Sequence, residues 1–278
     1  MTIGCGGEVR VTDGNSPEGK PLLGVMGGEH PLAALVDYAE TYGPGVIERF
    51  VRSLPSVNQA VDLGAGSGRD LQIVRKAHPA SRLLAVEGGR RYAEGLRALA
   101  DEVHLLDIER DLLPFEMETV DLVICNQILE HVKEVFWIFH EISRTLRVGG
   151  HLLVGVPNVA SLHNRLLLLF GVQPTQHKLC SAHVRPFSRR DTLRFLEACF
   201  PGGYLLEKFS GAQFYPFPVS LARPLARVFP TCAFSIFFLL RKVRPYRDEF
   251  ATYPSRAGFE TNFWAGNVTT GTQYESGS

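Results

Sequence analysis

Short apolar runs alternate with amphipathic segments through the first half of the chain. The runs predict strands at 60–63, 82–86, 103–108, 120–125 and 151–156. The segments between them repeat apolar positions at helical spacing and predict helices at 70–77, 90–100 and 133–146. Strands that alternate with helices form a mostly parallel sheet with helices on both faces. Runs without polar alternation fit this architecture, because both faces of such a sheet are buried.

The flanks of this alternation are less regular. Residues 1–28 form a Gly-rich polar lead, and 30–54 show helical spacing that is interrupted at 43–45. After residue 158 we expect an insertion at 159–187 with a short apolar helix at 162–170, then a helix capped by Ser188 and a strand at 204–209. A second insertion at 211–232 leads to a last strand at 235–240, and 244–278 reads as a polar C-terminal tail.

The composition is that of a globular protein, and its charges cancel. Of 278 residues, 45% are hydrophobic, and 29 basic residues balance 29 acidic ones. This disfavours a protein held on nucleic acid by bulk positive charge, because phosphate contacts need clustered Lys and Arg. The five cysteines form no C-x-x-C pair, so we expect neither a disulfide framework nor a metal site.

No targeting or membrane-spanning segment is indicated. Residues 1–20 lack the apolar core of a signal peptide. The longest apolar runs, at 166–170 and 233–240, are too short to cross a bilayer. We therefore expect a soluble protein of the cytoplasm, where unpaired cysteines are stable.

The sharpest local signal is the glycine-rich turn at 61–68, which leaves a predicted strand and opens a predicted helix. Glycines permit a tight turn and a close ligand, and the free N–H groups of the helix favour an anionic group. Three interpretations compete: a nicotinamide dinucleotide site, a turn without a ligand, and an S-adenosylmethionine site. The dinucleotide fingerprint is disfavoured, because Arg69 stands where its third glycine belongs.

Two acidic residues follow the next two predicted strands. Glu87 ends one strand, and its carboxylate could accept hydrogen bonds from both hydroxyls of a ribose. Asp107 stands at the end of the next, where it could accept from an adenine amino group. Ligands of open α/β sheets bind beyond the carboxyl ends of the strands, so the three features favour the S-adenosylmethionine interpretation.

Five stretches carry a resemblance to a known family. They are V-D-L-G-A-G-S-G at 61–68, the acidic Glu87, D-I at 107–108 before L-P-F, V-D-L-V at 120–123 and L-E-H-V at 129–132. They resemble class I S-adenosylmethionine-dependent methyltransferases, and more narrowly the group with the ubiquinone-type O-methyltransferases. L-R-V-G-G at 146–150 is similar to that family's turn before its fifth strand, with Val148 in place of the usual proline.

The resemblance implies a Rossmann-like seven-stranded α/β domain at 29–243, whose cofactor half is 45–158. It implies an N-terminal helical lid and acceptor-side insertions after strands five and six. It implies that the methionine part of the cofactor is bound by Gly64, Gly66 and Gly68, and its amino group by Asp62. The ribose would be bound by Glu87 and the adenine by Asp107 and Ile108. The sulfonium end would be lined by Asn126 and Gln127.

Two histidines are candidate bases for an acceptor that must lose a proton. His131 follows the fourth predicted strand, and a structural role at the start of the next helix is the competing interpretation. His183 begins H-V-R-P-F-S, which resembles a stretch in methyltransferases of bacterial glycan and natural-product pathways. That resemblance implies that His183 and Arg185 face the acceptor, Arg185 as a bidentate clamp on phosphate or carboxylate. His177 is a further candidate for acceptor binding.

We interpret the chain as an enzyme that methylates a small-molecule, glycan or lipid-linked acceptor, preferably at oxygen. S-adenosylhomocysteine would be the second product. Apolar residues at 166–170 and 214–218 either pack on the core or cover an acceptor with an apolar body. A basic bias after residue 222 would suit peripheral contact with an anionic membrane. The alternative is a protein that binds the cofactor without transferring methyl, or one that uses the fold for another reaction.

Overall fold

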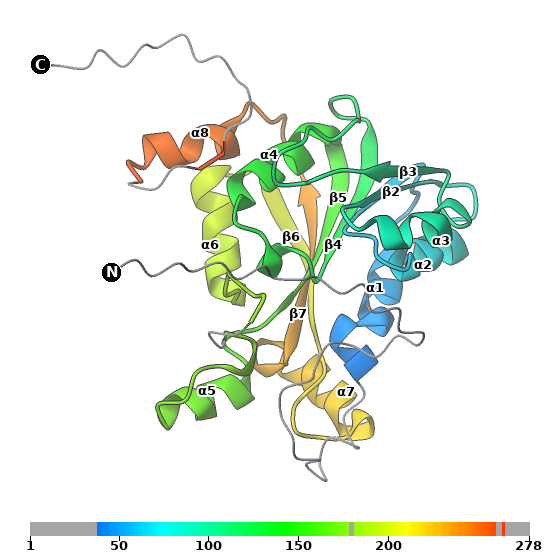
Figure 1. Ribbon diagram of the computed structural model, residues 1–278. Coiled ribbons are helices and arrows are strands. Elements are labelled where there is room, and N and C mark those ends of the chain that lie inside the picture. Colours follow the sequence, from blue (N-terminus) through cyan, green and yellow to red (C-terminus); the bar gives the residue numbers. More distant parts are fainter. Residues whose placement is uncertain (1–37, 178–180, 260–262, 265–278) are drawn as a thin grey trace, which may run out of the picture.

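A seven-stranded sheet is the centre of the computed structural model, which describes residues 38–177, 181–259 and 263–264. The strand order is β3-β2-β1-β4-β5-β7-β6, and β7 alone runs antiparallel to its neighbours (Figure 1). The strands are β1 (Gln59–Leu63), β2 (Arg82–Glu87), β3 (Glu102–Leu105), β4 (Val120–Asn126), β5 (Leu146–Pro157), β6 (Tyr204–Ala212) and β7 (Ser235–Lys242). The predicted Rossmann-like α/β fold is confirmed.

Helices cover both faces of the sheet, because successive strand residues point to opposite sides. Val61 and Leu63 of β1 belong to one buried apolar cluster, and Ala60 belongs to the other. The first cluster includes α4 (Val135–Thr145), α6 (Arg189–Cys199) and α8 (Glu249–Arg256). The second includes α1 (Pro44–Val51), α2 (Arg69–Ala77) and α3 (Ala93–Arg97).

Two further helices lie at the carboxyl edge of the sheet, at the bottom of Figure 1. β5 leads into α5 (Leu162–Leu169), and β6 leads into α7 (Val219–Val228). Short 3-10 helices complete the fold: η2 (Tyr38–Tyr42), η3 (Arg90–Tyr92), η4 (Leu129–His131), η5 (Thr175–His177) and η6 (Pro230–Cys232). Within the described residues no helix is both long and apolar enough to cross a membrane.

The helix α1 is a core element of the domain, within the predicted cofactor half. Val46, Ile47, Phe50 and Val51 of α1 are at most 4% exposed and pack in the cluster with α2. Their helical spacing puts them on one side, so the helix buries that side on the sheet. The segment before residue 38, with the predicted lead at 1–28, lies outside the described residues, and the predicted N-terminal lid stays a prediction.

The domain does not end at residue 243, as the polarity of the following segment led us to expect. Tyr246 and Phe250 are 7% and 0% exposed, and α8 packs against α4 and α6. The buried residues of α8 itself, Phe250 and Pro254, are four positions apart and so share one side of the helix, and Tyr246 precedes the helix. The predicted polar tail therefore begins with a buried part of the domain.

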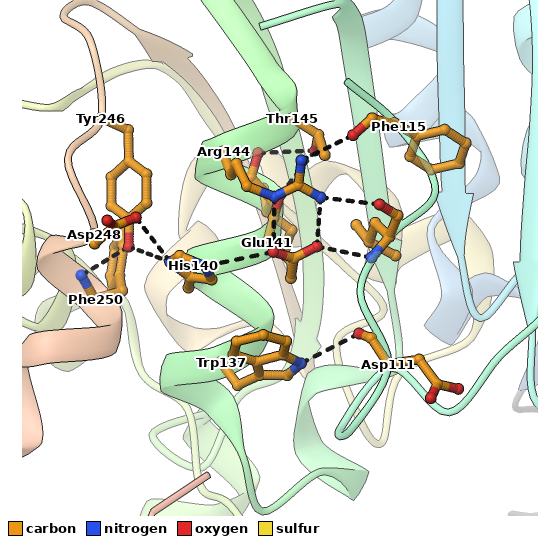
Figure 2. A network of polar contacts seen from close by, with 12 residues as sticks. Asp111, Phe115, Trp137, His140, Glu141, Arg144, Thr145, Tyr246, Asp248 and Phe250 are labelled. Atoms are coloured by element: carbon orange, nitrogen blue, oxygen red, sulfur yellow. Dashed lines mark hydrogen bonds and ion pairs between the residues drawn. The ribbon is translucent and has the colours of Figure 1, made fainter. Parts of the chain in front are cut away.

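A polar network fixes this C-terminal segment to α4 (Figure 2). The Tyr246 hydroxyl contacts His140 Nδ1 at 3.0 Å and accepts the Phe250 N–H at 3.0 Å. His140 Nε2 lies 3.4 Å from Glu141, whose carboxylate also pairs with Arg144. Arg144 and Glu141 in turn bind backbone groups of the loop at 113–115. The network therefore connects the C-terminal segment, α4 and the loop that follows β3.

Several predicted elements differ from the structure in their bounds, and two of them lie before the cofactor cavity. The predicted helix at 90–100 is η3 followed by the short α3, and β3 ends at Leu105. Asp107 and Ile108 therefore lie in a loop and not at the tip of a strand. Ser188 caps α6 as predicted, because its hydroxyl oxygen accepts the Asp191 N–H at 3.3 Å.

Candidate active site

The glycine-rich turn leaves β1 at the point where the strand order reverses, between β1 and β4. Gly64, Gly66 and Gly68 all have positive φ, of 73°, 51° and 76°. A Cβ at Gly64 would lie 2.9 Å from Ile128 Cδ1, whereas one at Gly66 would meet nothing closer than 4.0 Å. Gly64 is therefore required by the close approach of Ile128, and Gly66 leaves its backbone open to a ligand.

Glu87 is positioned over this turn from the end of β2. Its two carboxylate oxygens accept the Gly66 N–H at 2.8 Å and the Gly89 N–H at 2.7 Å. Each oxygen has a second lone pair, so two further donors can still bind. The orientation is fixed from both sides by backbone groups, as a preorganised ligand site requires.

A cavity of about 530 Å³ opens beside Glu87. Its walls come from the loops after β1, β2, β3 and β4, and the lining residues include Gly64, Glu87, Asp107, Ile108 and Ile128. Asp107 Oδ1 accepts the Glu109 N–H at 3.0 Å, and its other oxygen has no bond within the described residues. Glu109 Oε1 accepts the N–H groups of Lys133 and Glu134 just before α4, so this oxygen fixes the loop to the start of that helix.

Buried carboxyl groups lie on the other side of the glycine turn. Asp62 is 3% exposed, and burial together with the charge of Asp70 raises its pKa well above the ordinary value. Asp70 is 6% exposed and accepts the Asn126 amide at 2.7 Å. Arg69 Nε already pairs with Asp70 Oδ1 at 3.0 Å, so a further bound cation would chiefly stabilise the charged form of Asp62. Asp70 was missed by sequence reasoning, because an acid in the first turn of a helix is ordinary.

The end of β4 carries two buried polar atoms that have no partner among the described residues. Asn126 Nδ2 donates to Asp70 and to the Tyr42 carbonyl at 3.1 Å, but Asn126 Oδ1 is buried without a partner among the described residues. Gln127 has a φ of 57°, and its Nε2 is likewise buried without a described partner. Buried polar atoms are normally bonded, so these two are candidates for ligand contact.

His131 and His183 come together although 52 positions separate them. Their ring centroids are 4.7 Å apart, and the rings meet edge to face. His131 ends η4, and His183 belongs to the loop before α6, which the backbone carbonyl of Glu130 holds through the Val184 N–H at 2.8 Å. The structure therefore joins the two candidate bases at one place beside the cavity, next to Ile128 and Val132 of its lining.

The hydrogen bonds of His131 define its tautomer. His131 Nδ1 lies 3.3 Å from the Ala182 carbonyl oxygen, which can only accept, so Nδ1 carries the proton. The lone pair of the neutral ring is then on Nε2, which faces Glu130 Oε1 at 3.9 Å. His183 has a pKa lowered to about 4 by burial and by its histidine neighbours, so it stays neutral at pH 7.

Glu130 forms a cluster with His131 and His183. It is 1% exposed, burial raises its pKa to about 8, and its Oε2 has no partner within the described residues. Glu130, His131 and His183 each offer one ligand atom, and these atoms lie within 4.8 Å of one another. The donor types are those of a divalent transition metal, which the sequence did not lead us to expect.

Arg185 and His177, the two residues predicted to bind the acceptor, have different surroundings in the structure. Arg185 Nε donates to the Val132 carbonyl at 3.1 Å, and its Nη2 donates to the Lys133 carbonyl. The guanidinium therefore braces the loop before α4, and it does not present the free fork that a bidentate clamp needs. His177 lies in η5 with its ring 6.1 Å from that of His183, so it stays at the margin of the cluster.

Comparison with known proteins supports the class of domain. Residues 61–154 match the family model described as a methyltransferase domain. This match supports, for that part of the chain, the predicted class of enzyme and its cofactor: an S-adenosylmethionine-dependent methyltransferase. The more specific ubiquinone-type or glycan group is not distinguished by it.

The curated relatives align over little more than a third of the chain. An uncharacterised 37.1 kDa protein in transposon Tn4556 of Streptomyces fradiae is 31% identical over 107 residues, 37% of this chain and 31% of that protein. Malonyl-[acyl-carrier protein] O-methyltransferase of Methylococcus capsulatus is 31% identical over 111 residues, 39% of this chain and 40% of that enzyme. The chain thus spans less than half the length of the curated relatives it matches.

A solved structure repeats the fold over a larger share. A methyltransferase of Thermotoga maritima, described as S-adenosylmethionine-dependent and a possible histamine N-methyltransferase, has a TM-score of 0.52 at 20% identity. The alignment covers 73% of this chain and 90% of that one. At this identity the likeness concerns the fold.

Proposed function

We propose that this protein transfers a methyl group from S-adenosylmethionine to an oxygen of a small-molecule, glycan or lipid-linked acceptor. The observation that carries the proposal is the cavity between Glu87, Asp107 and the glycine turn, at the strand-order reversal where ligands of such sheets bind. The residues present fit the cofactor, because there is free space beside Gly66 and because Asn126 Oδ1 and Gln127 Nε2 have no partner among the described residues.

In this proposal the nucleoside end lies in the cavity. Glu87 would accept hydrogen bonds from both ribose hydroxyls with the lone pairs that Gly66 and Gly89 leave free. Asp107 would accept from the adenine amino group with its unbonded oxygen, and the Ile108 backbone lies beside it in the lining. Both assignments use acids whose orientation the backbone already fixes.

The charged end would lie across the glycine turn. The amino group of the cofactor is a cation, and Asp62 with Asp70 provides a buried acidic pair to receive it. Binding of an ammonium group there would lower the raised pKa of Asp62, because an adjacent positive charge favours the ionised carboxylate. Gly64 and Gly68 shape the turn, and Asn126 and Gln127 would line the sulfonium end.

The sulfonium supplies an already activated methyl group, so the protein need only position the acceptor and handle its proton. His131 is suited to accept that proton, because its Nε2 carries the lone pair and its Nδ1 is fixed by Ala182. His183 keeps a neutral ring beside it and so limits competition for the proton. His177 stands at the margin of this site, where it would contact a larger acceptor.

The acceptor side is bounded by the two insertions. α5 has only Asn164 buried, and Leu169 and Phe170 are 76% and 79% exposed. The apolar face of this helix therefore does not pack on the core within the described residues. An acceptor with an apolar body, or a membrane that carries it, would cover this face.

The test measures cofactor binding and product formation separately. S-adenosylmethionine is titrated calorimetrically into the wild type and Glu87→Gln, with the exposed Glu94→Gln as the matched control. Formation of S-adenosylhomocysteine is then followed with a panel of hydroxylated acceptors: phenols, sugar nucleotides and polyprenyl-linked sugars. Loss of binding only in Glu87→Gln supports the cofactor site.

Product that disappears in His131→Gln while cofactor binding persists supports the transfer reaction. Binding without product from any acceptor would favour the alternative, a protein that holds the cofactor without methyl transfer. Absence of cofactor binding in the folded wild type would overturn both.

A further inference from the structure

A second cavity, of about 280 Å³, lies outside the site described above. It shares no lining residue with the cavity beside Glu87. Its walls come from η2, the start of α1, the carboxyl end of β6 and α7. The lining residues are Glu40, Gly45, Val46, Arg49, Gly211, Ala212, Arg223 and Arg227.

The lining of this cavity is strongly basic. Three guanidinium groups face a single carboxylate. Arg223 binds that carboxylate in a bidentate manner, with Nε and Nη2 at 3.1 and 2.9 Å from the two oxygens of Glu40. Arg49 and Arg227 have no paired carboxylate in the part of the chain that the structure describes. The cavity therefore carries two positive charges that its own walls do not neutralise.

The two uncompensated cations are held close to each other. Arg49 is anchored from α1, where its Nη1 donates to the Gly45 carbonyl at 2.9 Å and its Nη2 donates to Ser210 Oγ at 3.3 Å. Burial and the charge of Arg227 lower the pKa of Arg49. Like charges repel, so this arrangement is stabilised by an anion that bridges them.

Two guanidinium groups that line one cavity are suited to binding a phosphate group. Arg presents planar N–H donors that match the oxygens of phosphate and carboxylate. Two arginines from α1 and α7, with the first turn of α1 at Gly45, approach one volume from different sides. A volume of about 280 Å³ accommodates a phosphate or diphosphate group.

The cavity connects to the proposed methyl-transfer site through η2. Glu40 of η2 holds Arg223, and the carbonyl of Tyr42, two residues later, accepts the Asn126 amide at 3.1 Å. On the outer side, α7 exposes Leu221, Val228 and Phe229, at 53%, 67% and 54%. A phosphate in the cavity would therefore lie between an apolar surface and the methionine end of the cofactor site.

We propose that this cavity is a binding site for a phosphate or diphosphate group, and that it holds the phosphorylated end of the acceptor. The second half of the proposal rests on the proposed methyltransferase function. The first half does not, and binding of the anion is measured without the cofactor.

The experiment titrates inorganic pyrophosphate into the full-length protein and follows binding by calorimetry. The variants are Arg227→Gln and Arg49→Gln/Arg227→Gln, and the control is Arg190→Gln, an exposed arginine at the start of α6. We expect saturable binding by the wild type and by Arg190→Gln. Arg227→Gln should weaken it at least tenfold, the usual loss for a hydrogen bond between charged groups.

Two further measurements keep the outcomes distinct. S-adenosylmethionine binding and thermal unfolding show that the variants are folded, and we expect both to be unchanged in Arg227→Gln. Sedimentation with phosphatidylglycerol vesicles, against phosphatidylcholine vesicles, tests a membrane as the source of the phosphate. Pyrophosphate binding without sedimentation on phosphatidylglycerol vesicles identifies a free phosphorylated ligand. If the wild type also sediments with these vesicles, and Arg227→Gln loses both the sedimentation and the pyrophosphate binding, the source is a lipid headgroup. Either result supports the site.

Absence of saturable pyrophosphate binding would overturn the proposal, even if vesicles bind. An equal weakening by Arg190→Gln would also overturn it, since the effect would then be that of overall surface charge. If the anion binds but S-adenosylmethionine does not, the cavity stands and the proposed function fails. If the cofactor binds and the anion does not, the proposed function stands and the cavity is refuted.

Discussion

Glu130 is a buried carboxyl group whose titration should be visible in the stability of the whole domain. Its side chain is 1% exposed, and burial raises its pKa to about 8 from 4.5. In the unfolded chain the carboxyl recovers its ordinary pKa. Between these two values the folded protein therefore retains a proton that the unfolded chain has lost.

The sign and size of the effect follow from this difference. The contribution of Glu130 to the free energy of unfolding is complete below about pH 4.5 and is lost as the pH rises toward 8. His183 changes the free energy of unfolding in the opposite direction, because its pKa is lowered to about 4 from the ordinary 6.5. Its contribution to the pH dependence therefore ends near pH 6.5, where the unfolded chain has also lost this proton. Between pH 6.5 and 8 one proton at about 1.4 kcal/mol per pH unit gives a loss of about 2 kcal/mol.

Urea unfolding at several pH values from 6.5 to 8 measures this loss in the wild type and in Glu130→Gln, whose amide cannot ionise. We expect the free energy of unfolding of the wild type to fall by about 2 kcal/mol relative to that of the variant. Glu94→Gln, a substitution on the exposed side of α3, serves as the control and should follow the wild type. Parallel pH dependence of wild type and Glu130→Gln would refute the burial argument.

Three other predictions test different parts of the structure. Phe250→Ala removes a ring that is 0% exposed and should lower the free energy of unfolding by about 3–5 kcal/mol in urea, whereas a change below about 0.5 kcal/mol would mean that the C-terminal helix is not part of the core. Gly64→Ala should weaken S-adenosylmethionine binding in calorimetry, because its Cβ would meet Ile128 at 2.9 Å with φ at +73°, while Gly95→Ala, with nothing within 4 Å, should leave it intact; equal affinities would contradict the close fit. His131→Gln should lower kcat by about 100-fold or more and leave the Kd of the cofactor unchanged, and an unaltered kcat would remove His131 as the base.

The strands could be predicted because their environment is uniform along the chain. β4 is buried on both faces, so its apolar run at 120–125 identifies it with an error of one residue. The glycine turn and Glu87 could be located for a related reason, since each directly follows such a run. The antiparallel β7 could be distinguished from a helix by its length and its aromatic residues.

The remaining features depend on contacts between distant segments. Arg185 looks like a ligand clamp in sequence, and only the fold shows that carbonyls at 132 and 133 occupy it. Arg49 and Arg227 are 178 positions apart and line one cavity only because α1 and α7 both pack against β6. The C-terminal helix was the exception, because the four-residue spacing of Phe250 and Pro254, its buried residues, is a local signal that the polarity of the segment concealed.

Calorimetric titration with S-adenosylmethionine tests the central claim most directly, with Glu87→Gln beside the wild type and Glu94→Gln as control. The arrangement of Glu87 over the glycine turn predicts binding to the wild type and control. It predicts a loss of about 1–3 kcal/mol in Glu87→Gln, the usual loss for hydrogen bonds to a charged group. Equal affinity of all three proteins, or no binding to a folded wild type, would contradict the assignment of this cavity to the cofactor.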